Sequence, residues 1–136
     1  MIKRSLFTVV AFLALASFAA CSHNGPTSVE SITIMRDDGN GKPGEAVESL
    51  KGTDHAFHAE IKLDVGTDKK ISTELIAVDT KEGKNVSVLS KDYELSGVEN
   101  TITLDYSLPN DWPAGTYKVN ASTGGRLLKS KEFTIQ

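Results

Sequence analysis

The chain has 136 residues, of which 39% are hydrophobic and 24% are charged, and its formal net charge is −3. This composition is ordinary for a globular domain and excludes a polytopic membrane protein, while the single cysteine excludes a miniprotein held together by disulfides. The acidic balance also argues against a nucleic-acid binder, which needs a basic face to replace phosphate counterions.

Residues 1–20 have the three-part pattern of a secretory signal peptide. Lys3 and Arg4 form a short positive region, an apolar stretch of 13 residues follows from Leu6 to Phe18, and small residues end the segment. A transmembrane anchor needs about 20 apolar residues, and a buried core helix would show a polar face. We therefore expect residues 1–20 to be removed during export.

The end of this segment, Phe18-Ala19-Ala20-Cys21, resembles the lipobox at which bacterial lipoproteins are cleaved. Phe18 departs from the aliphatic residue that is usual there. The resemblance implies that Cys21 carries palmitate and related acyl chains and anchors the protein to a membrane. Cleavage after Ala19, which would leave Cys21 as a free thiol, is the alternative. The lipid is favoured because Cys21 is the only cysteine, and a free thiol is a liability in an oxidising compartment.

The lipid is also the only membrane contact that the mature chain predicts. Loss of Lys3 and Arg4 leaves 13 basic and 18 acidic residues, a net charge of −5, so anionic headgroups do not attract the domain. Residues 21–28 read as the lipidated cysteine and a short polar tether that reaches at most about 25 Å. In lipoproteins of enteric-type Gram-negative bacteria, Asp after the cysteine favours the inner membrane. Ser22 therefore implies an outer-membrane anchor facing the periplasm if the source is Gram-negative.

Residues 29–136 predict an all-β domain, because apolar and polar residues alternate in short stretches and no helical periodicity appears beyond one weak turn within 44–51. Turn residues separate the stretches, as in the loop 37–44 and the hairpin turn at Gly124-Gly125. About 108 residues with this pattern suit a seven-stranded sandwich. The predicted strands are 29–35, 57–64, 71–78, 86–88, 101–106, 117–121 and 133–135.

The stretch Trp112-Pro113-x-Gly115-x-Tyr117 resembles the approach to the penultimate strand of immunoglobulin-like domains. The resemblance implies a tyrosine corner, in which the buried Tyr117 donates its hydroxyl proton to an upstream backbone group. Val119 stands where antibody domains carry their second cysteine, so a true antibody-type domain is excluded. With the hairpin and last strand that follow, this stretch is similar to bacterial immunoglobulin-like extracytoplasmic domains of uncharacterised function. It implies a seven-stranded antiparallel immunoglobulin-like β-sandwich over about residues 30–136 and no activity.

Two groups of residues invite a metal-site interpretation. The loop Asp37–Gly41 is rich in oxygen ligands, but Lys42 occupies a place where an EF-hand loop needs an acid or amide. His55 and His58 are three apart, which on a strand places them on opposite faces, and His23 lies in the tether. We expect a solvated turn, ordinary surface histidines and no bound metal. A metal-binding lipoprotein using these residues remains an alternative.

No catalytic pattern appears in the sequence, since it has no nucleophile elbow, zinc-protease helix motif or phosphate-binding loop. Glu60 and Asp64 flank Lys62 on one strand face, as on a solvated surface. We expect no enzyme activity, no cofactor and no small-molecule substrate.

The remaining motifs have structural and functional interpretations. Trp112 is expected to fill the end of the sandwich rather than to contact a sugar or a protein. Four cations near the last hairpin would form either a modest basic face or a charged strand edge that discourages aggregation: Lys118, Arg126, Lys129 and Lys131.

Together these features predict a membrane-anchored lipoprotein of the bacterial cell envelope that acts as a non-enzymatic binding or accessory module. Its partner would be a protein of unknown identity and not a nucleic acid. An inhibitor or modulator of an envelope enzyme is a further alternative, because sandwich loops and edges commonly serve as contact surfaces.

Overall fold

The computed structural model describes residues 25–96 and 100–136, and the predicted signal peptide, Cys21 and His23 lie outside this part of the chain. The described residues form nine strands and no helix, so they contain no helix that could span a membrane. In chain order the strands are β1 (Ser28–Asp37), β2 (Pro43–Ala46), β3 (Ser49–Leu50), β4 (Ala56–Asp64), β5 (Lys70–Thr80), β6 (Gly83–Glu94), β7 (Thr101–Ser107), β8 (Gly115–Thr123) and β9 (Arg126–Ile135).

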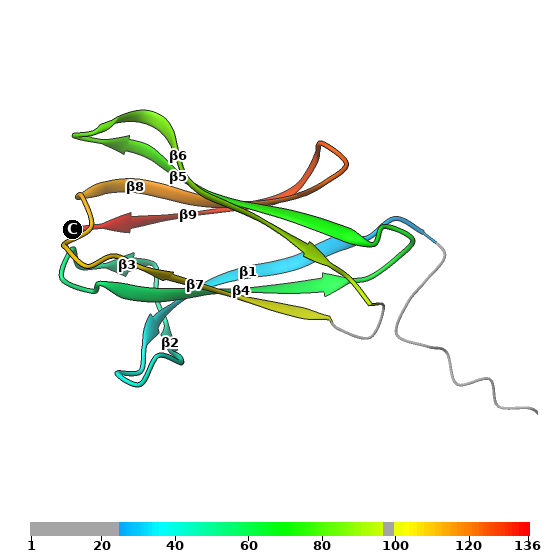
Figure 1. Cartoon of the computed structure of the whole chain (residues 1–136), viewed down its shortest axis with the longest axis horizontal. Coiled ribbons are helices and arrows are strands. Elements are labelled where there is room, and N and C mark those ends of the chain that lie inside the picture. The colour runs from blue at the N-terminus through cyan, green and yellow to red at the C-terminus, as the bar shows by residue number, and fades with distance from the viewer. Residues whose placement is uncertain (1–24, 97–99) are drawn as a thin grey trace, which may run out of the picture.

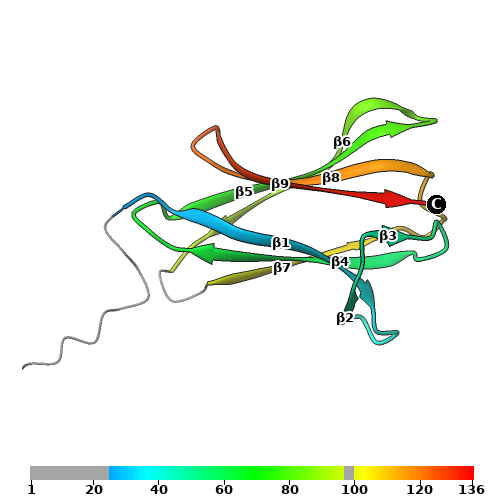
Figure 2. The same ribbon diagram turned by 180° about the vertical axis from the view of Figure 1, so that it is seen from behind.

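The strands form two sheets that pack face to face, as Figures 1 and 2 show from opposite sides. One sheet has the order β2-β1-β4-β7 and the other the order β3-β9-β8-β5-β6. All neighbours are antiparallel except the short β3, which pairs in parallel with β9. The predicted all-β sandwich is therefore confirmed.

Each of the seven predicted stretches is a strand, and the structure adds two short strands where the sequence suggested a weak helical turn. The helical turn is wrong, because residues 43–46 fold back on β1 as β2, and Leu50 is buried while β3 pairs with β9. Nothing in the alternation could reveal β2, since all four of its residues are exposed. At the last hairpin, Gly124 and Gly125 adopt φ of +55° and +78°, as the predicted turn requires.

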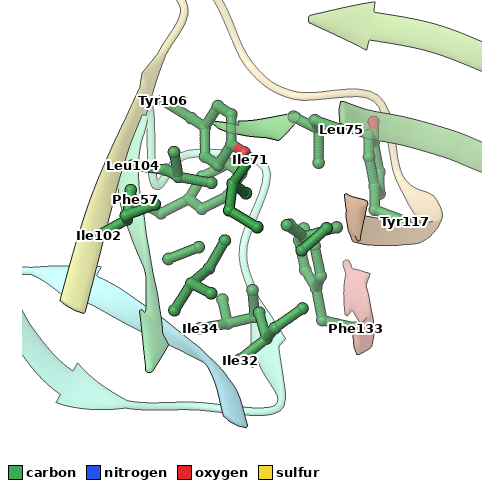
Figure 3. Packing of buried hydrophobic residues seen from close by; sticks show 14 of the residues in the cluster. Ile32, Ile34, Phe57, Ile71, Leu75, Ile102, Leu104, Tyr106, Tyr117 and Phe133 are labelled. Atoms are coloured by element: carbon green, nitrogen blue, oxygen red, sulfur yellow. The ribbon is translucent and has the colours of Figure 1, made fainter. Parts of the chain in front are cut away.

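The core is organised around Phe57, which is fully buried on β4 (Figure 3). Its ring centroid lies 5.1 Å from that of Tyr106, 5.0 Å from that of Trp112 and 5.5 Å from that of Phe133. Tyr106 belongs to the same sheet as Phe57, and Phe133 belongs to the opposite sheet. These ring contacts therefore join the two layers, and aromatic pairs at such distances contribute beyond their buried area.

The two ends of the sandwich differ in what they carry (Figure 1). The chain enters at one end, where Thr27 donates its backbone N–H to Asp68 and accepts a hydrogen bond from the N–H of Gly66. Thr67 also donates its N–H to the carbonyl of Gly25, and a Cβ on Gly66 would lie 2.0 Å from that carbonyl oxygen. Because Gly25 and Thr27 are fixed to the domain, at most residues 22–24 can separate Cys21 from its surface. The C-terminus lies at the opposite end, with the loop that contains Trp112.

The predicted tyrosine corner is present. Tyr117 is buried, its ring stacks on that of Phe133, and its hydroxyl donates a hydrogen bond of 2.6 Å to the carbonyl of Pro113. Tyr117→Phe keeps the ring and leaves that carbonyl without its donor. We expect the free energy of unfolding to fall by about 1–3 kcal/mol, the usual cost of an orphaned buried polar group.

Urea unfolding measures this loss as a lower midpoint with an unchanged slope, because the surface exposed on unfolding does not change. Tyr93→Phe is the matched control, since the Tyr93 hydroxyl bonds to no other described residue and should be dispensable. Equal stability of Tyr117→Phe and the wild type would contradict the structural role of the corner.

Candidate functional site

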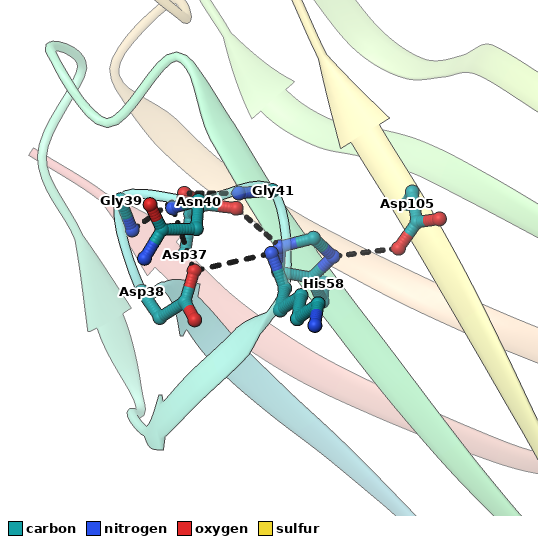
Figure 4. A network of polar contacts seen from close by, with 8 residues as sticks. Asp37, Asp38, Gly39, Asn40, Gly41, His58 and Asp105 are labelled. Atoms are coloured by element: carbon teal, nitrogen blue, oxygen red, sulfur yellow. Dashed lines mark hydrogen bonds and ion pairs between the residues drawn. The ribbon is translucent and has the colours of Figure 1, made fainter.

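A cluster of polar side chains in the described part of the chain is centred on His58 (Figure 4). His58 lies on β4, on the face of the sheet opposite to Phe57. Its Nε2 lies 2.7 Å from Oδ1 of Asp37, and its Nδ1 lies 2.6 Å from Oδ1 of Asp105. The side chain of His58 is only 3% exposed, although that of Asp105 is 72% exposed. The prediction of a surface histidine is therefore wrong for His58.

The burial of His58 has two structural causes. Asp105 is its direct cross-strand neighbour on β7, and Asp37 closes over it from the end of β1. Cross-strand neighbours have Cβ atoms about 4.5–5.5 Å apart, so their side chains meet on one face. Neither contact can be read from β4 alone, because both partners are distant in sequence.

The loop Asp37–Gly41 uses its carboxylates to hold its own turn. Oδ2 of Asp37 accepts hydrogen bonds from the N–H groups of Gly39 and Gly41, at 2.8 and 3.3 Å. Oδ1 of Asp38 accepts from the N–H groups of Asn40 and Lys42, at 2.7 and 3.2 Å. These are the local side-chain to backbone bonds by which Asp favours turns. Within the described residues, no three Asp, Glu, His or Cys side chains are arranged to hold a metal ion.

The two carboxylates favour the protonated form of His58. A neutral imidazole can donate only one hydrogen bond, whereas the imidazolium can donate to both Asp37 and Asp105. Burial by itself lowers the pKa of His58, but the hydrogen bonds and charges of the two carboxylates outweigh it and raise this pKa above 6.5. The hydrogen bond from His58, assisted by the Gly39 N–H, lowers the pKa of Asp37 below 3.8.

His55 lies apart from this cluster. Its Nε2 is 2.6 Å from Oδ1 of Asp111, in an exposed pair at the end of the sandwich. Its carbonyl accepts the indole N–H of Trp112 at 3.1 Å, and Trp112 is buried against Phe57. The predicted burial of Trp112 at the end of the sandwich is thus confirmed. The two histidines do not converge on a common site, since one belongs to an outer sheet face and the other to a loop.

The cations of the last hairpin do not form one basic face. Lys118 pairs across the strands with Glu132, whereas Lys131 pairs with the inward-facing Val119 and so takes the other face of the sheet. Lys131 also forms an ion pair of 2.7 Å with Glu48, and Arg126 lies 3.7 Å from Asp68.

The sequence did not predict an apolar groove that runs between β6 and β7. It consists of three adjoining hollows of about 370, 310 and 270 Å³. Leu89, Asp105 and Tyr106 are shared by the first two hollows, and Val88, Leu108 and Trp112 by the last two.

β6 leaves its apolar residues unusually accessible along this groove. Val86, Val88 and Leu89 are 42%, 41% and 48% exposed, and they are three of the four exposed large hydrophobic residues in the described chain. The alternation at residues 86–88 predicts a strand with a buried face, but that face opens onto the groove. The sequence gives no signal of this, because alternation shows which residues share a face and not what covers it.

The His58 cluster makes stability depend on pH. Because the folded-state pKa of His58 is raised, its contribution is complete below 6.5 and is lost as pH rises through the folded value. The contribution of Asp37, whose folded-state pKa is lowered, is complete above 3.8 and is lost as pH falls through its folded value. The network should therefore be most stabilising between these two limits.

We expect His58→Gln to lower the free energy of unfolding by about 1.5–3 kcal/mol in this window, the range for hydrogen bonds to charged groups, and by less as pH rises above it. Urea midpoints of the variant and the wild type across pH measure the difference. His55→Gln, which removes an exposed pair, should change the midpoint little at any pH. A difference between wild type and His58→Gln that grows as pH rises would contradict the charge state assigned to His58.

No protein-family model matches the sequence, and no curated protein sequence does either. Among solved structures, an immunoglobulin-like protein from Pseudomonas aeruginosa matches with a TM-score of 0.62 at 15% identity, over 83% of this chain and 98% of its own. The alkylpurine DNA glycosylase AlkC from Pseudomonas fluorescens, bound to DNA, gives 0.49 at 12% identity, over 83% of this chain and 31% of its own. A β-glucosidase from Kluyveromyces marxianus gives a TM-score of 0.45 at 16% identity, over 78% of this chain and 14% of its own. The Pseudomonas aeruginosa structure establishes the fold alone: the chain is an immunoglobulin-like β-sandwich, as the stretch around Tyr117 implied.

Proposed function

We propose that this protein is a lipid-anchored, non-enzymatic module of the bacterial cell envelope that binds a protein partner through the groove between β6 and β7. The observation that carries the binding role is the exposed apolar wall formed by Val86, Val88 and Leu89. Monomeric proteins rarely expose contiguous apolar surface without a use for it, and such surface commonly marks an interaction site. The lipid anchor rests on the sequence of residues 1–21.

The placement of the groove suits an anchored module. With at most residues 22–24 between Cys21 and the fixed Gly25, the end of the sandwich that carries Thr27 would face the membrane at a distance of about 10 Å. The groove ends at Trp112 and Pro113, near the opposite end. A partner could therefore reach this part of the groove from the aqueous side while the lipid holds the domain in place.

The chemistry of the described residues favours binding over catalysis. Both ring nitrogens of His58 are engaged by carboxylates, so its ring has no nitrogen left to accept a proton from a substrate. His55 and Asp111 form an exposed pair, and neither residue lines the three hollows of the groove. A metal-binding role has less support, because Asp37 and Asp38 already bond the backbone of their own loop.

Cys21→Ser tests the anchor. We expect the wild type to fractionate with membranes and the variant to be released in soluble form, because a serine cannot receive the thioether-linked lipid. Mass spectrometry of the mature wild-type N-terminus should show acyl chains on Cys21. Ser22→Asp is the matched control, since it changes the adjacent residue and should leave the protein acylated. An unmodified Cys21 thiol, or equal membrane retention of Cys21→Ser, would overturn the anchor.

Site-specific photocrosslinking in the native envelope tests the binding role. A benzoylphenylalanine in place of Leu89 should give a discrete protein adduct, because Leu89 lines the groove. The same group in place of Leu127 is the control, since Leu127 is also an exposed leucine but lies on β9 outside the groove. Adducts of equal yield at both positions, or none at either, would argue against the groove as the binding surface. A metal-induced rise in melting temperature would instead support the metal-binding alternative.

A further inference from the structure

The groove is bordered by an open sheet edge. β6, which has 12 residues, is the last strand in the order β3-β9-β8-β5-β6. No described strand pairs with its outer side. At the opposite edge of the same sheet, the two-residue β3 pairs with Thr134 and Ile135 of β9. On an edge strand of an antiparallel sheet, alternate residues turn their N–H and C=O groups outward, where they can pair with another chain.

The register shows which residues of β6 face the groove. Val86 pairs with Ala77, Leu89 with Leu75 and Lys91 with Thr73, and all three β5 partners are buried. Directly paired residues share one face of a sheet, so Val86, Leu89 and Lys91 also face inward. A shift in register between Leu75 and Ile76 makes Val88 the extra residue of a bulge.

Lys91 carries a positive charge that no described carboxylate neutralises in an ion pair. Its Nζ lies 5.1 Å from the centroid of the Tyr93 ring, and it forms no ion pair with any described residue. On the same strand, by contrast, Asp92 is paired with Lys70 at 3.0 Å. Between residues 91 and 86, the inward side of β6 therefore presents one cation without an ion pair, Lys91, followed by two apolar side chains.

We propose that β6 takes up an extended segment of the partner protein as an additional antiparallel strand, with an acidic residue opposite Lys91 and apolar residues opposite Leu89 and Val86. This inference rests on the proposed function and names the chemistry of the partner. β5 supplies the spacing, since Thr73, Leu75 and Ala77 face the same three residues at intervals of two. An added strand without a bulge on the outer side of β6 would also place every second residue opposite Lys91, Leu89 and Val86. Because this strand is antiparallel to β6, its sequence reads acid-x-apolar-x-apolar from its N-terminus.

A second copy of the chain does not have this pattern. If two β6 strands pair in antiparallel fashion with their inward sides matched, Val86 lies opposite Leu89 of the copy. The same register puts Lys84 opposite Lys91 at both ends, and like charges directly opposite each other are unfavourable. The charge pattern of β6 therefore favours a foreign acidic segment over self-association.

The probe is the synthetic peptide acetyl-Thr-Glu-Thr-Val-Thr-Val-Thr-amide, added to the full-length protein in detergent. Trp112 is the only tryptophan and lines the groove, so its fluorescence reports binding, and amide chemical shifts locate the contact on β6. We expect saturable binding, about twofold to fivefold tighter than that of the same peptide with Lys in place of Glu, as one exposed ion pair allows.

Two variants of the protein sharpen this test. Lys91→Glu should reverse the preference between the two peptides, an effect that apolar contact alone cannot produce. Leu89→Ser should weaken both peptides, whereas the matched Leu127→Ser should weaken neither.

Each of three results would overturn strand addition: no response to either peptide at millimolar concentration, shifts that fall outside β6, or a preference that Lys91→Glu leaves unchanged. A dimer in sedimentation equilibrium that Leu89→Ser dissociates would make a second copy the occupant and would also overturn it. The proposed function is judged separately by crosslinking at residue 89, so it can survive this failure.

Discussion

The contact of Phe57 with Tyr106, Trp112 and Phe133 is the interaction on which the other features of this domain depend. Phe57 points inward from β4 and joins the two sheets, while the next residue, His58, points outward and joins β4 to β7 and to the end of β1. One pair of adjacent residues thus secures the apolar core on one side of the sheet and a charged network on the other. The same aromatic cluster holds Trp112, whose buried ring forms part of the groove wall. The groove wall therefore includes a residue of the buried aromatic cluster.

The groove lies at one edge of the larger sheet, and the two edges of this sheet differ in their strand pairing. At one edge β3 pairs with β9, and Lys131 pairs with Glu48 beside it. At the other edge no described strand lies beyond β6, and its inward face borders the groove together with β7 and the loop that carries Trp112. A bulge and flanking lysines are devices that natural edge strands use against uncontrolled pairing. β6 has both, and it nevertheless exposes Val86, Val88 and Leu89, which is consistent with pairing that is selective rather than prevented.

Much of this fold could be predicted from the sequence, because strands that bury one face show period-two alternation and because Tyr117 follows Gly115 at the spacing of a tyrosine corner. The burial of His58 could not be predicted, since it depends on Asp37 and Asp105, which approach only when β1, β4 and β7 pair. β2 was missed because an exposed hairpin strand has no apolar signal. The groove was missed for a related reason: Val86 and Val88 alternate as in a buried strand, and only the strand order shows that no described strand lies beyond β6.

The His58 cluster and the groove between β6 and β7 meet at Asp105, and this contact bears on the charge of the groove. Asp105 lines the groove beside Leu89 and Lys91. Its carboxylate is the kind of group with which Lys91 would form an ion pair. Its Oδ1 is nevertheless held by Nδ1 of His58 at 2.6 Å, on the other face of its sheet, so it does not form an ion pair with Lys91. The His58 ring that contacts Asp37 thus also holds the carboxylate of Asp105. The positive charge of Lys91 therefore has no ion-pair partner among the described residues and is available for the acidic side chain of the proposed partner.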